Sequence, residues 1–358
     1  MGEKMKRFAI FRLKLWQAVA FIACLLITVL IFIEPQKIKN GVTDGLNLCA
    51  EVIVPSLFPF TIVALFLFKS GIIGFIGRAL SPVTKKLFHL DENTAGVVLL
   101  SFIAGYPVGA KLISELYESR CITAKRAETM LYYSVNGGPA FIVIAVGCGM
   151  LNNEKLGVIL LVSHILASLI ICFLTARFEK EETTAAVKID RDSILSSFVN
   201  ATADSVTSMF SICSWVIVFS VIGVVIDIFF KSPELNTVLS CVTEVTTGIK
   251  KLAFSGTVPS VSFFLGFSGI SIHMQVLSSL KNLKISYSVF LIMRVINGIL
   301  SSVICTVILH FFPISVDTFS SFGKSAEYGT ASMSIPLFFA LMLTSATFLA
   351  FCKSQRKK

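Results

Sequence analysis

The stretches SFIAGYPVGAKLISEL (residues 101–116) and FFLGFSGISIHMQVL (residues 263–277) decide the fold of this chain. Both are apolar, and both are interrupted by glycine, which weakens a helix. Gly105 of the first stretch and Gly266 of the second are 161 residues apart. A glycine-broken apolar stretch at the same place in two halves of a chain points to the binding site of a transporter.

A second pair of motifs has the same spacing. The motifs SVNGGPAF and VINGILSS place Asn136 and Asn297 161 residues apart as well. Each motif lies in an apolar run long enough to cross a membrane, Thr129–Leu151 in the first half and Val295–Val316 in the second. Because glycine and proline interrupt helical hydrogen bonding, we expect both runs to be broken helices.

The composition is that of a polytopic membrane protein. The 358 residues are 55% hydrophobic and 15% charged, and the mean hydropathy is +0.84. Charge-free runs of spanning length leave room for seven or eight crossings with short loops. These runs are Leu15–Ile33, Val52–Phe68, Thr129–Leu151, Leu156–Ala176, Ser205–Ile226, Val295–Val316 and Tyr328–Cys352.

The first run follows the basic sequence MGEKMKRFAIFRLK. Leu15–Ile33 is long for the apolar core of a signal peptide, and no small-residue cleavage site follows it. We therefore expect a retained anchor helix with a cytoplasmic N-terminus, followed by an outside loop over Pro35–Asn47.

The net charge of +10 has a simpler explanation than nucleic-acid binding. The basic residues lie in short segments beside the spans, as the positive-inside rule predicts for cytoplasmic loops. We expect the lipid bilayer, and no nucleic acid, as a partner. The basic positions include Arg78, Lys85, Lys86, Arg120, Lys125, Arg126 and the segment Arg177–Arg191.

Two apolar stretches are expected to enter the membrane without crossing it. Asn93–Ala110 contains three glycines and a proline and has basic loops on both sides, so we expect a re-entrant helical hairpin. Leu252–Leu280 is its counterpart. An odd number of crossings between the halves inverts the second relative to the first. The predicted fold class is an all-α polytopic membrane protein with two inverted repeats, each with a re-entrant hairpin and a broken helix.

The predicted organisation has four parts: an N-terminal anchor helix (1–40), a first repeat (41–177), a cytoplasmic linker (178–197) and a second repeat (198–358). Seven crossings would place the C-terminal KSQRKK outside, against the positive-inside rule. An additional crossing through Asn236–Ile249 would resolve this conflict, as would an orientation set by the stronger N-terminal signal.

Signatures of enzymes and metal sites are missing from the sequence. It has no Walker loop, HExxH, GxSxG or GxGD motif. Its nine cysteines form no CxxC pair and no Cys/His cluster at metal-ligand spacing. We expect no catalytic residues, no cofactor and no metal, and we interpret the cysteines as small buried hydrophobic residues.

The two predicted hairpin tips are the first candidates for substrate binding. Half-helix N-termini expose backbone N–H groups and partial positive charge, which suits an anion such as a carboxylate. The aromatic residues at the tips could stack on an aromatic ring, whereas the alternative is that both breaks are packing kinks. The candidates are Gly105, Tyr106, Pro107, Gly109, Gly266, Phe267, Ser268 and Gly269.

Polar residues in the apolar runs complete the candidate site. Asn136, Gly137 and Asn297 would offer hydrogen bonds to a ligand, or serve as contacts between helices. Arg294 is one helical turn from Asn297, so both lie on one face. A charge at that depth costs a few kcal/mol and usually faces a cavity or a partner, unless it snorkels to the interface. His273 follows the second break and is a further candidate.

Acidic residues at or near apolar runs are candidates for coupling transport to protons or sodium. They are Glu51, Asp204 and Glu244, each of which could instead be an interfacial carboxylate. His164, within an apolar run, is interpreted as a satisfied interhelical hydrogen bond.

The sequence resembles a known family at these motifs. The segments GYPVGAKLISELYESRCITAKRAETMLYYSVNGGPAFIVIAVGCGML, EVTTGIKKL and GFSGISIHMQV are similar to the sporulation integral membrane protein YlbJ family, within the nucleoside-recognition Gate group. The resemblance covers residues 47–352. The chain differs from the family pattern at Gly137, where a polar residue is frequent, and its second break is GFSG where the first is GYPVG.

The resemblance implies a fold similar to that of concentrative nucleoside transporters and a role in endospore formation. It further implies that dipicolinic acid is moved across the outer forespore membrane of the mother cell. Two other functions remain open: transport of a nucleoside or another heterocycle, and a non-transporting role in assembling the spore envelope. The sequence also leaves open whether the protein forms a homo-oligomer.

Overall fold

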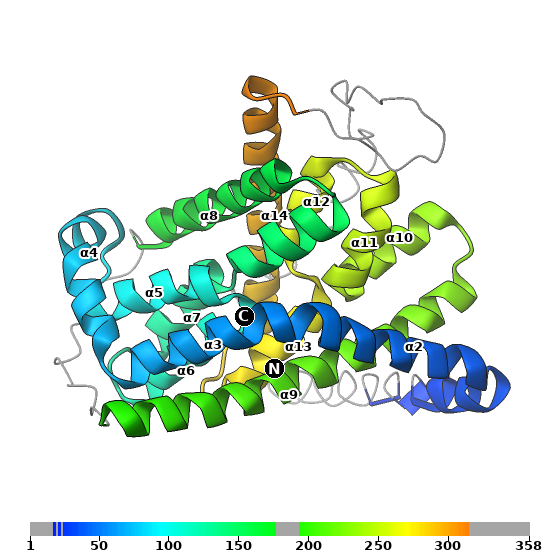
Figure 1. Ribbon diagram of the computed structural model, residues 1–358, viewed down its shortest axis with the longest axis horizontal. Coiled ribbons are helices and arrows are strands. Elements are labelled where there is room, and N and C mark those ends of the chain that lie inside the picture. The colour runs from blue at the N-terminus through cyan, green and yellow to red at the C-terminus, as the bar shows by residue number, and fades with distance from the viewer. Residues whose placement is uncertain (1–16, 19–20, 23, 177–192, 315–358) are drawn as a thin grey trace, which may run out of the picture.

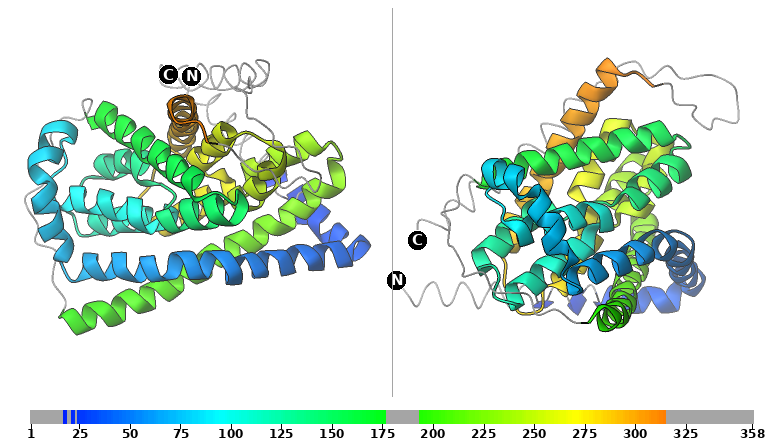
Figure 2. Two further views of the ribbon diagram at one scale, coloured as in Figure 1. Left: turned by 45° about the horizontal axis from the view of Figure 1, so that its top comes forward. Right: turned by 60° about the vertical axis from the view of Figure 1, so that its left-hand side comes forward.

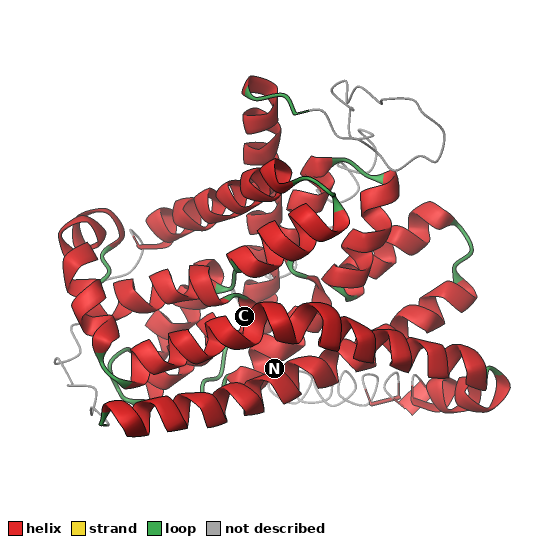
Figure 3. Ribbon diagram, viewed as in Figure 1, coloured by secondary structure: helices red, strands yellow, loops and turns green. Residues whose placement is uncertain are grey.

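The structure, a computed structural model, describes residues 17–18, 21–22, 24–176 and 193–314. All regular elements of these residues are helices (Figures 1 and 3). In the first half they are the apolar helix Cys24–Ile33, α2 (Pro35–Leu48), the π-helical turn η1 (Cys49–Ile53), α3 (Val54–Lys69), α4 (Ile72–Phe88), α5 (Glu92–Ala104), α6 (Tyr106–Glu118), α7 (Ala124–Ser134), the π-helix η2 (Ala140–Met150) and α8 (Glu154–Ala176).

The second half begins with the longest of these helices. It consists of α9 (Ile194–Phe229), α10 (Pro233–Thr243), α11 (Val245–Ser255), α12 (Val258–Phe267), α13 (Gly269–Ser279) and α14 (Tyr287–Phe311). The described residues contain five helical segments long and apolar enough to cross a membrane, or six if the bent pair α4–α5 is one span. The predicted run Tyr328–Cys352 lies outside the described residues, as does most of the linker. Most of the predicted run Leu15–Ile33 is described and helical, including the apolar helix Cys24–Ile33.

The loop predicted over Pro35–Asn47 is wrong, because these residues form α2 and continue through η1 into α3. Proline fits the first turn of a helix, where its missing N–H is not needed. The glycines of α2 serve packing, since a Cβ added to Gly45 would lie only 3.0 Å from the Cα of Ile217 in α9. Figure 2 shows α2 and α3 crossing α9 along one face.

The first break has the backbone geometry of a hairpin. Gly105 has φ 96° and ψ −177°, a conformation that favours glycine, and it reverses the chain between α5 and α6. A Cβ on Gly109 would lie 2.7 Å from the Cβ of Ser101, so the two helices fold back closely on each other. Whether this hairpin is re-entrant stays a prediction, as does the inversion of the two halves.

The second hairpin, predicted over Leu252–Leu280, does not form in the same way. α12 and α13 follow one another as a single apolar segment, Val258–Ser279, that is long enough to span. Ser268 and Gly269 both have left-handed backbone conformations, with φ of 77° and 66°. Because ψ of Ser268 is −3°, unlike the extended ψ of Gly105, the break offsets the helix without reversing the chain.

The two predicted broken spans also differ. The break of the first is confirmed, since α7 ends at Ser134 and η2 begins at Ala140, whereas its crossing of the membrane stays a prediction. The second is wrong, because α14 runs unbroken through Asn297 and Gly298. The residue directly after Gly298 is not a proline, whereas a proline directly follows the glycines of the first motif. The absence of a side chain on Gly298 lets α12 approach, since a Cβ on Gly266 would lie 2.6 Å from the Cα of Gly298.

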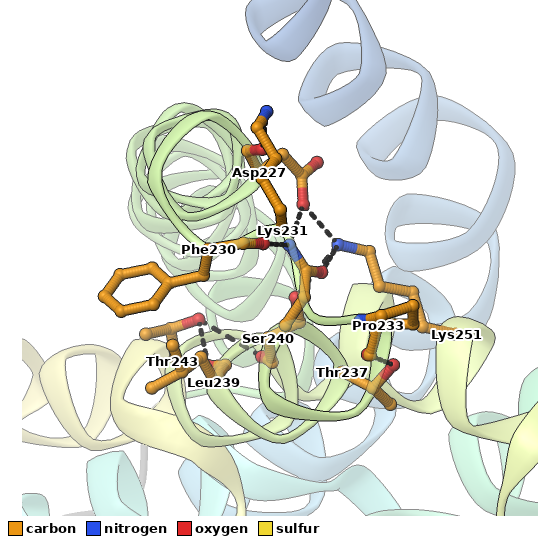
Figure 4. A network of polar contacts seen from close by, with 10 residues as sticks. Asp227, Phe230, Lys231, Pro233, Thr237, Leu239, Ser240, Thr243 and Lys251 are labelled. Atoms are coloured by element: carbon orange, nitrogen blue, oxygen red, sulfur yellow. Dashed lines mark hydrogen bonds and ion pairs between the residues drawn. The ribbon is translucent and has the colours of Figure 1, made fainter.

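The additional crossing considered through Asn236–Ile249 is not one helix, because α10 and α11 are separated at Glu244. A polar contact network fixes this pair of short helices to the end of α9 (Figure 4). The ammonium of Lys251 in α11 donates to Asp227 Oδ1 and Asn236 Oδ1, both at 2.8 Å, and to Ser240 Oγ at 3.0 Å. Lys251 therefore has a structural role, because its ammonium joins α11 to oxygen atoms of α9 and α10.

Candidate functional site

The interruptions of the helices meet in pairs. A Cβ added to Gly105, at the turn between α5 and α6, would lie 3.4 Å from the backbone nitrogen of Gly138, between α7 and η2. A Cβ added to Gly269, at the break between α12 and α13, would lie 3.1 Å from the backbone nitrogen of Val245, where α11 begins. Each half therefore brings two interrupted backbones into contact inside the fold.

Buried polar side chains from the breaks, from α8 and from α14 lie in the same part of the core. We call this group the central polar cluster, and its side chains are almost fully inaccessible to solvent. Its members are Tyr106, Asn136, His164, Ser168, Ser268, Arg294 and Asn297.

One serine joins the two equivalent asparagines. Ser168 Oγ, in α8, donates to Asn136 Oδ1 at 2.6 Å and accepts from Asn297 Nδ2 at 3.0 Å. Asn136 Nδ2 also donates to the carbonyl of Tyr133, at 2.5 Å, which closes the last turn of α7. Asn297 Oδ1 has no partner among the described residues. Both asparagines thus act as contacts between elements, and one acceptor atom of the second remains unpaired within the described part of the chain.

Arg294 is the largest fully buried side chain of the described residues. Its Nη2 donates to the carbonyl of Gly266 and, at 2.8 Å, to Ser268 Oγ, at the break between α12 and α13. Within the described part of the chain, its Nε and Nη1 have no hydrogen-bond partner and no carboxylate forms an ion pair with it. The expected alternative, a snorkelling arginine, does not fit full burial. Three N–H donors of a buried guanidinium therefore remain unused.

His164 binds the interrupted backbone between α7 and η2. The N–H of Gly137 donates to His164 Nε2 at 3.1 Å, which in a neutral imidazole places the proton on Nδ1. Nδ1 is buried and has no partner among the described residues. His164 therefore satisfies the break, as expected for an interhelical hydrogen bond, and offers an additional free donor.

Tyr106 connects the two halves directly. Its hydroxyl donates to the carbonyl of Leu265 at 2.8 Å, and its ring packs edge-on against Phe141 and His164. Tyr106 therefore joins the tip of the first hairpin, to which it belongs, to the last turns of α12 before the second break. Its ring faces protein side chains in this structure, so stacking on a substrate stays a prediction.

Phe267 and His273 lie beside the cluster and contact each other through a hydrogen bond and through their rings. His273 Nε2 is 2.9 Å from the carbonyl of Phe267, and Nδ1 is 3.3 Å from the hydroxyl of Tyr287. The rings of Phe267 and His273 are 5.1 Å apart, and Phe267 also stacks parallel to Phe263. Both nitrogens of His273 are therefore engaged within the protein.

The remaining residues of the two predicted tips pack within the protein. Pro107 lies buried in the first turn of α6, where a proline is tolerated. Gly109 packs against the carbonyl of Ser134, and Gly269 packs against α11. These contacts fit the packing-kink alternative for the tips.

The three candidate acids have contacts of their own, and none hydrogen-bonds or ion-pairs with the central polar cluster. Glu51 is exposed in η1. Asp204 forms an ion pair with Lys69 at 3.0 Å, and Lys111 donates to its backbone carbonyl. Glu244 caps α11, with its two carboxylate oxygens accepting from the N–H groups of Thr246 and Thr247. Ion coupling by these groups stays a prediction.

The described residues contain no group of three or more metal-ligating side chains.

His164 and Ser168 belong to the central polar cluster, but the sequence did not mark them as candidate site residues. They are four residues apart, so they share one face of α8, in an otherwise apolar helix. That spacing is the signal that could have identified them, once the asparagine motifs had marked the neighbouring helices.

Comparison with known proteins places this arrangement in a family. Residues 50–229, from η1 to α9, match the family described as Gate, nucleoside recognition. The sporulation integral membrane protein YlbJ of Bacillus subtilis (strain 168) is 26% identical, over 78% of this chain and 79% of the relative. Neither description is that of an enzyme. No solved structure matches the chain.

Proposed function

The chain belongs to the Gate family of nucleoside-recognition proteins, and on that premise we propose that it is a membrane transporter or facilitator for dipicolinic acid. In this proposal it acts in endospore formation and moves this small aromatic dicarboxylate across the outer forespore membrane. The similarity to a sporulation membrane protein and the five apolar spanning segments support a membrane protein in sporulation.

The observation that carries the substrate class is the buried, incompletely paired guanidinium of Arg294. Burying a charge without a partner costs several kcal/mol, so an intramembrane arginine of this kind marks a site for an anion. The free Nδ1–H of His164 adds a neutral donor. A planar ring with two carboxylates would supply the missing acceptors for both groups.

Binding at Arg294 would act on the second break. Nη2 now holds the Gly266 carbonyl and Ser268 Oγ. A carboxylate that engages Nε and Nη2 in the fork-like geometry preferred by guanidinium groups takes one of the two Nη2 protons and so competes with one of these contacts. Substrate binding would thereby weaken the hold of Arg294 on the break between α12 and α13, which couples the bound anion to this junction.

Uptake of labelled dipicolinate into proteoliposomes containing the purified protein tests this function. We expect saturable uptake that excess nucleoside does not reduce, with imposed proton or sodium gradients identifying the coupling ion. Absence of uptake by folded protein would contradict the proposal and favour an assembly role.

Transport of a nucleoside is the second candidate, and one observation favours it. Asn297 Oδ1 is a buried acceptor without a partner among the described residues, which suits an N–H or O–H donor of a nucleoside better than a carboxylate. In this case nucleosides would block uptake and would themselves be transported, and replacing Arg294 would have little effect.

A further inference from the structure

Helix α4 has an exposed apolar stripe. One face of the helix, formed by Ile73, Gly77 and Ser81, is buried, and Gly77 packs against the backbone of Glu92 at the start of α5. The other side carries exposed apolar residues at spacings of three and four, so they form one continuous line along the helix. The stripe consists of Ile72, Phe75, Ala79, Val83 and Leu87, with Phe75 75% exposed and Val83 59% exposed.

Basic side chains border this stripe. Arg78 and Lys85 are seven residues apart and therefore lie on the same side of α4, between the buried face and the stripe. Lys86 follows at the C-terminal end. Arg78 forms an exposed ion pair with Glu92 at 3.2 Å, whereas Lys85 and Lys86 are exposed and have no partner among the described residues. The helix thus presents apolar surface flanked by unneutralised positive charge.

The position of α4 fits a membrane interface. Its axis is bent by 94° from the apolar helix α5, and it lies across one end of the molecule, where α3 ends (Figure 1). Arg126 Nη2, at the start of α7, donates to the carbonyl of His89 at 2.7 Å, which brings another basic turn to the same end. An end of a membrane protein rich in Lys and Arg faces the cytoplasm, where the leaflet carries anionic lipids.

We propose that α4 is an interfacial helix that binds anionic lipid headgroups through Arg78, Lys85 and Lys86, while its apolar stripe inserts among the acyl chains. Charge complementarity selects this occupant, because a stripe covered by another protein would not need flanking free cations. Long basic side chains suit this place, since they extend their charged ends to the headgroups while their stems stay apolar. This inference does not depend on the proposed transport function.

Tryptophan quenching by brominated lipids tests the proposal. The full chain has two tryptophans, Trp16 and Trp215, so a Phe75→Trp variant that also carries Trp16→Phe and Trp215→Phe reports on α4 alone. In bilayers of zwitterionic and anionic lipid, we expect quenching when either lipid is brominated and stronger quenching when the anionic one is. In the same background, Lys85→Gln with Lys86→Gln should reduce that preference roughly tenfold.

A matched control removes two charges elsewhere. Lys37→Gln with Lys39→Gln changes two exposed lysines of α2, which begins at the opposite end of the molecule in Figure 1, and should leave the preference unchanged. Equal quenching by both lipids, or a preference that survives the Lys85 and Lys86 changes, would overturn the headgroup site. If the signal of the introduced tryptophan responds neither to brominated lipid nor to an aqueous quencher, another protein surface covers this face, and the proposal is overturned as well.

Discussion

Asn136 and Asn297 occupy equivalent places in the two halves of the sequence and bind the same hydroxyl, Ser168 Oγ, at 2.6 and 3.0 Å. One asparagine lies in an interrupted backbone and the other in a continuous helix. The serine therefore couples the broken element of the first half to the intact helix that carries Arg294.

Removing the serine should uncouple the two asparagines. Ser168→Ala leaves a buried amide oxygen and a buried amide N–H without their partner, so we expect a loss of about 1–3 kcal/mol of unfolding free energy. A double-mutant cycle with Asn136→Ala and Asn297→Ala should show coupling in the native background and almost none in the Ser168→Ala background.

The control for this experiment is Ser205→Ala in α9. Ser205 is also buried, but among the described residues its hydroxyl binds only the carbonyl of Ala201 in its own helix, so the change should be nearly neutral. An equal loss of stability in both variants would show that the bridge through Ser168 contributes nothing specific.

Close packing of α12 on α14 should make Gly266 intolerant of a side chain. An added Cβ would lie 2.6 Å from the Cα of Gly298, so Gly266→Ala should cost about 1–3 kcal/mol of stability through overpacking. Gly223→Ala in α9 is the matched control, because nothing lies within 4 Å of its Cβ, and it should be neutral or stabilising by up to about 1 kcal/mol. Thermal unfolding in detergent distinguishes the two, and a tolerated Gly266→Ala would contradict this packing.

His164 should contribute to stability by accepting the hydrogen bond from the backbone N–H of Gly137. His164→Ala leaves the N–H of Gly137 without an acceptor and should cost about 1–3 kcal/mol. His164→Gln restores an acceptor and should recover part of that loss. If dipicolinate also uses Nδ1, both variants should bind it more weakly, whereas unchanged binding with a stability loss in the alanine variant alone would assign His164 a purely structural role.

Arg294 should lower the unfolding free energy of the protein when no substrate is bound. Because its charge is buried without an ion-pair partner among the described residues, Arg294→Met is expected to be neutral or to raise the unfolding free energy by about 1–2 kcal/mol. Saturating dipicolinate should raise the melting temperature of the native protein but not of this variant. A large destabilisation by Arg294→Met would indicate a structural arginine and would contradict the account.

Local signals in the sequence predicted the breaks that depend on backbone chemistry. Gly105 and the Gly137-Gly138-Pro139 run interrupt their helices because glycine and proline act within a turn or two of their own position. Arg294 and the two asparagines were selected for their polarity in apolar runs, and the structure brings them close together.

Tertiary packing explains what the sequence reasoning got wrong. Gly298 resembles a helix breaker in the sequence, and Gly45 lies in a segment predicted as a loop, but each lies in a helix and gives a neighbouring helix room to approach. Ser168 was overlooked because an isolated serine in an apolar helix usually bonds its own backbone. Its role becomes visible only when α8 lies between the two asparagine-bearing elements.

Calorimetric titration of dipicolinate into the purified protein, in native form and as Arg294→Gln, is the sharpest test of a substrate site at Arg294. We predict binding to the native protein and a dissociation constant raised at least roughly tenfold in the variant, because a charge-assisted hydrogen bond is lost. Equal affinity in native and variant protein of equal thermal stability would contradict it and exclude Arg294 from the site.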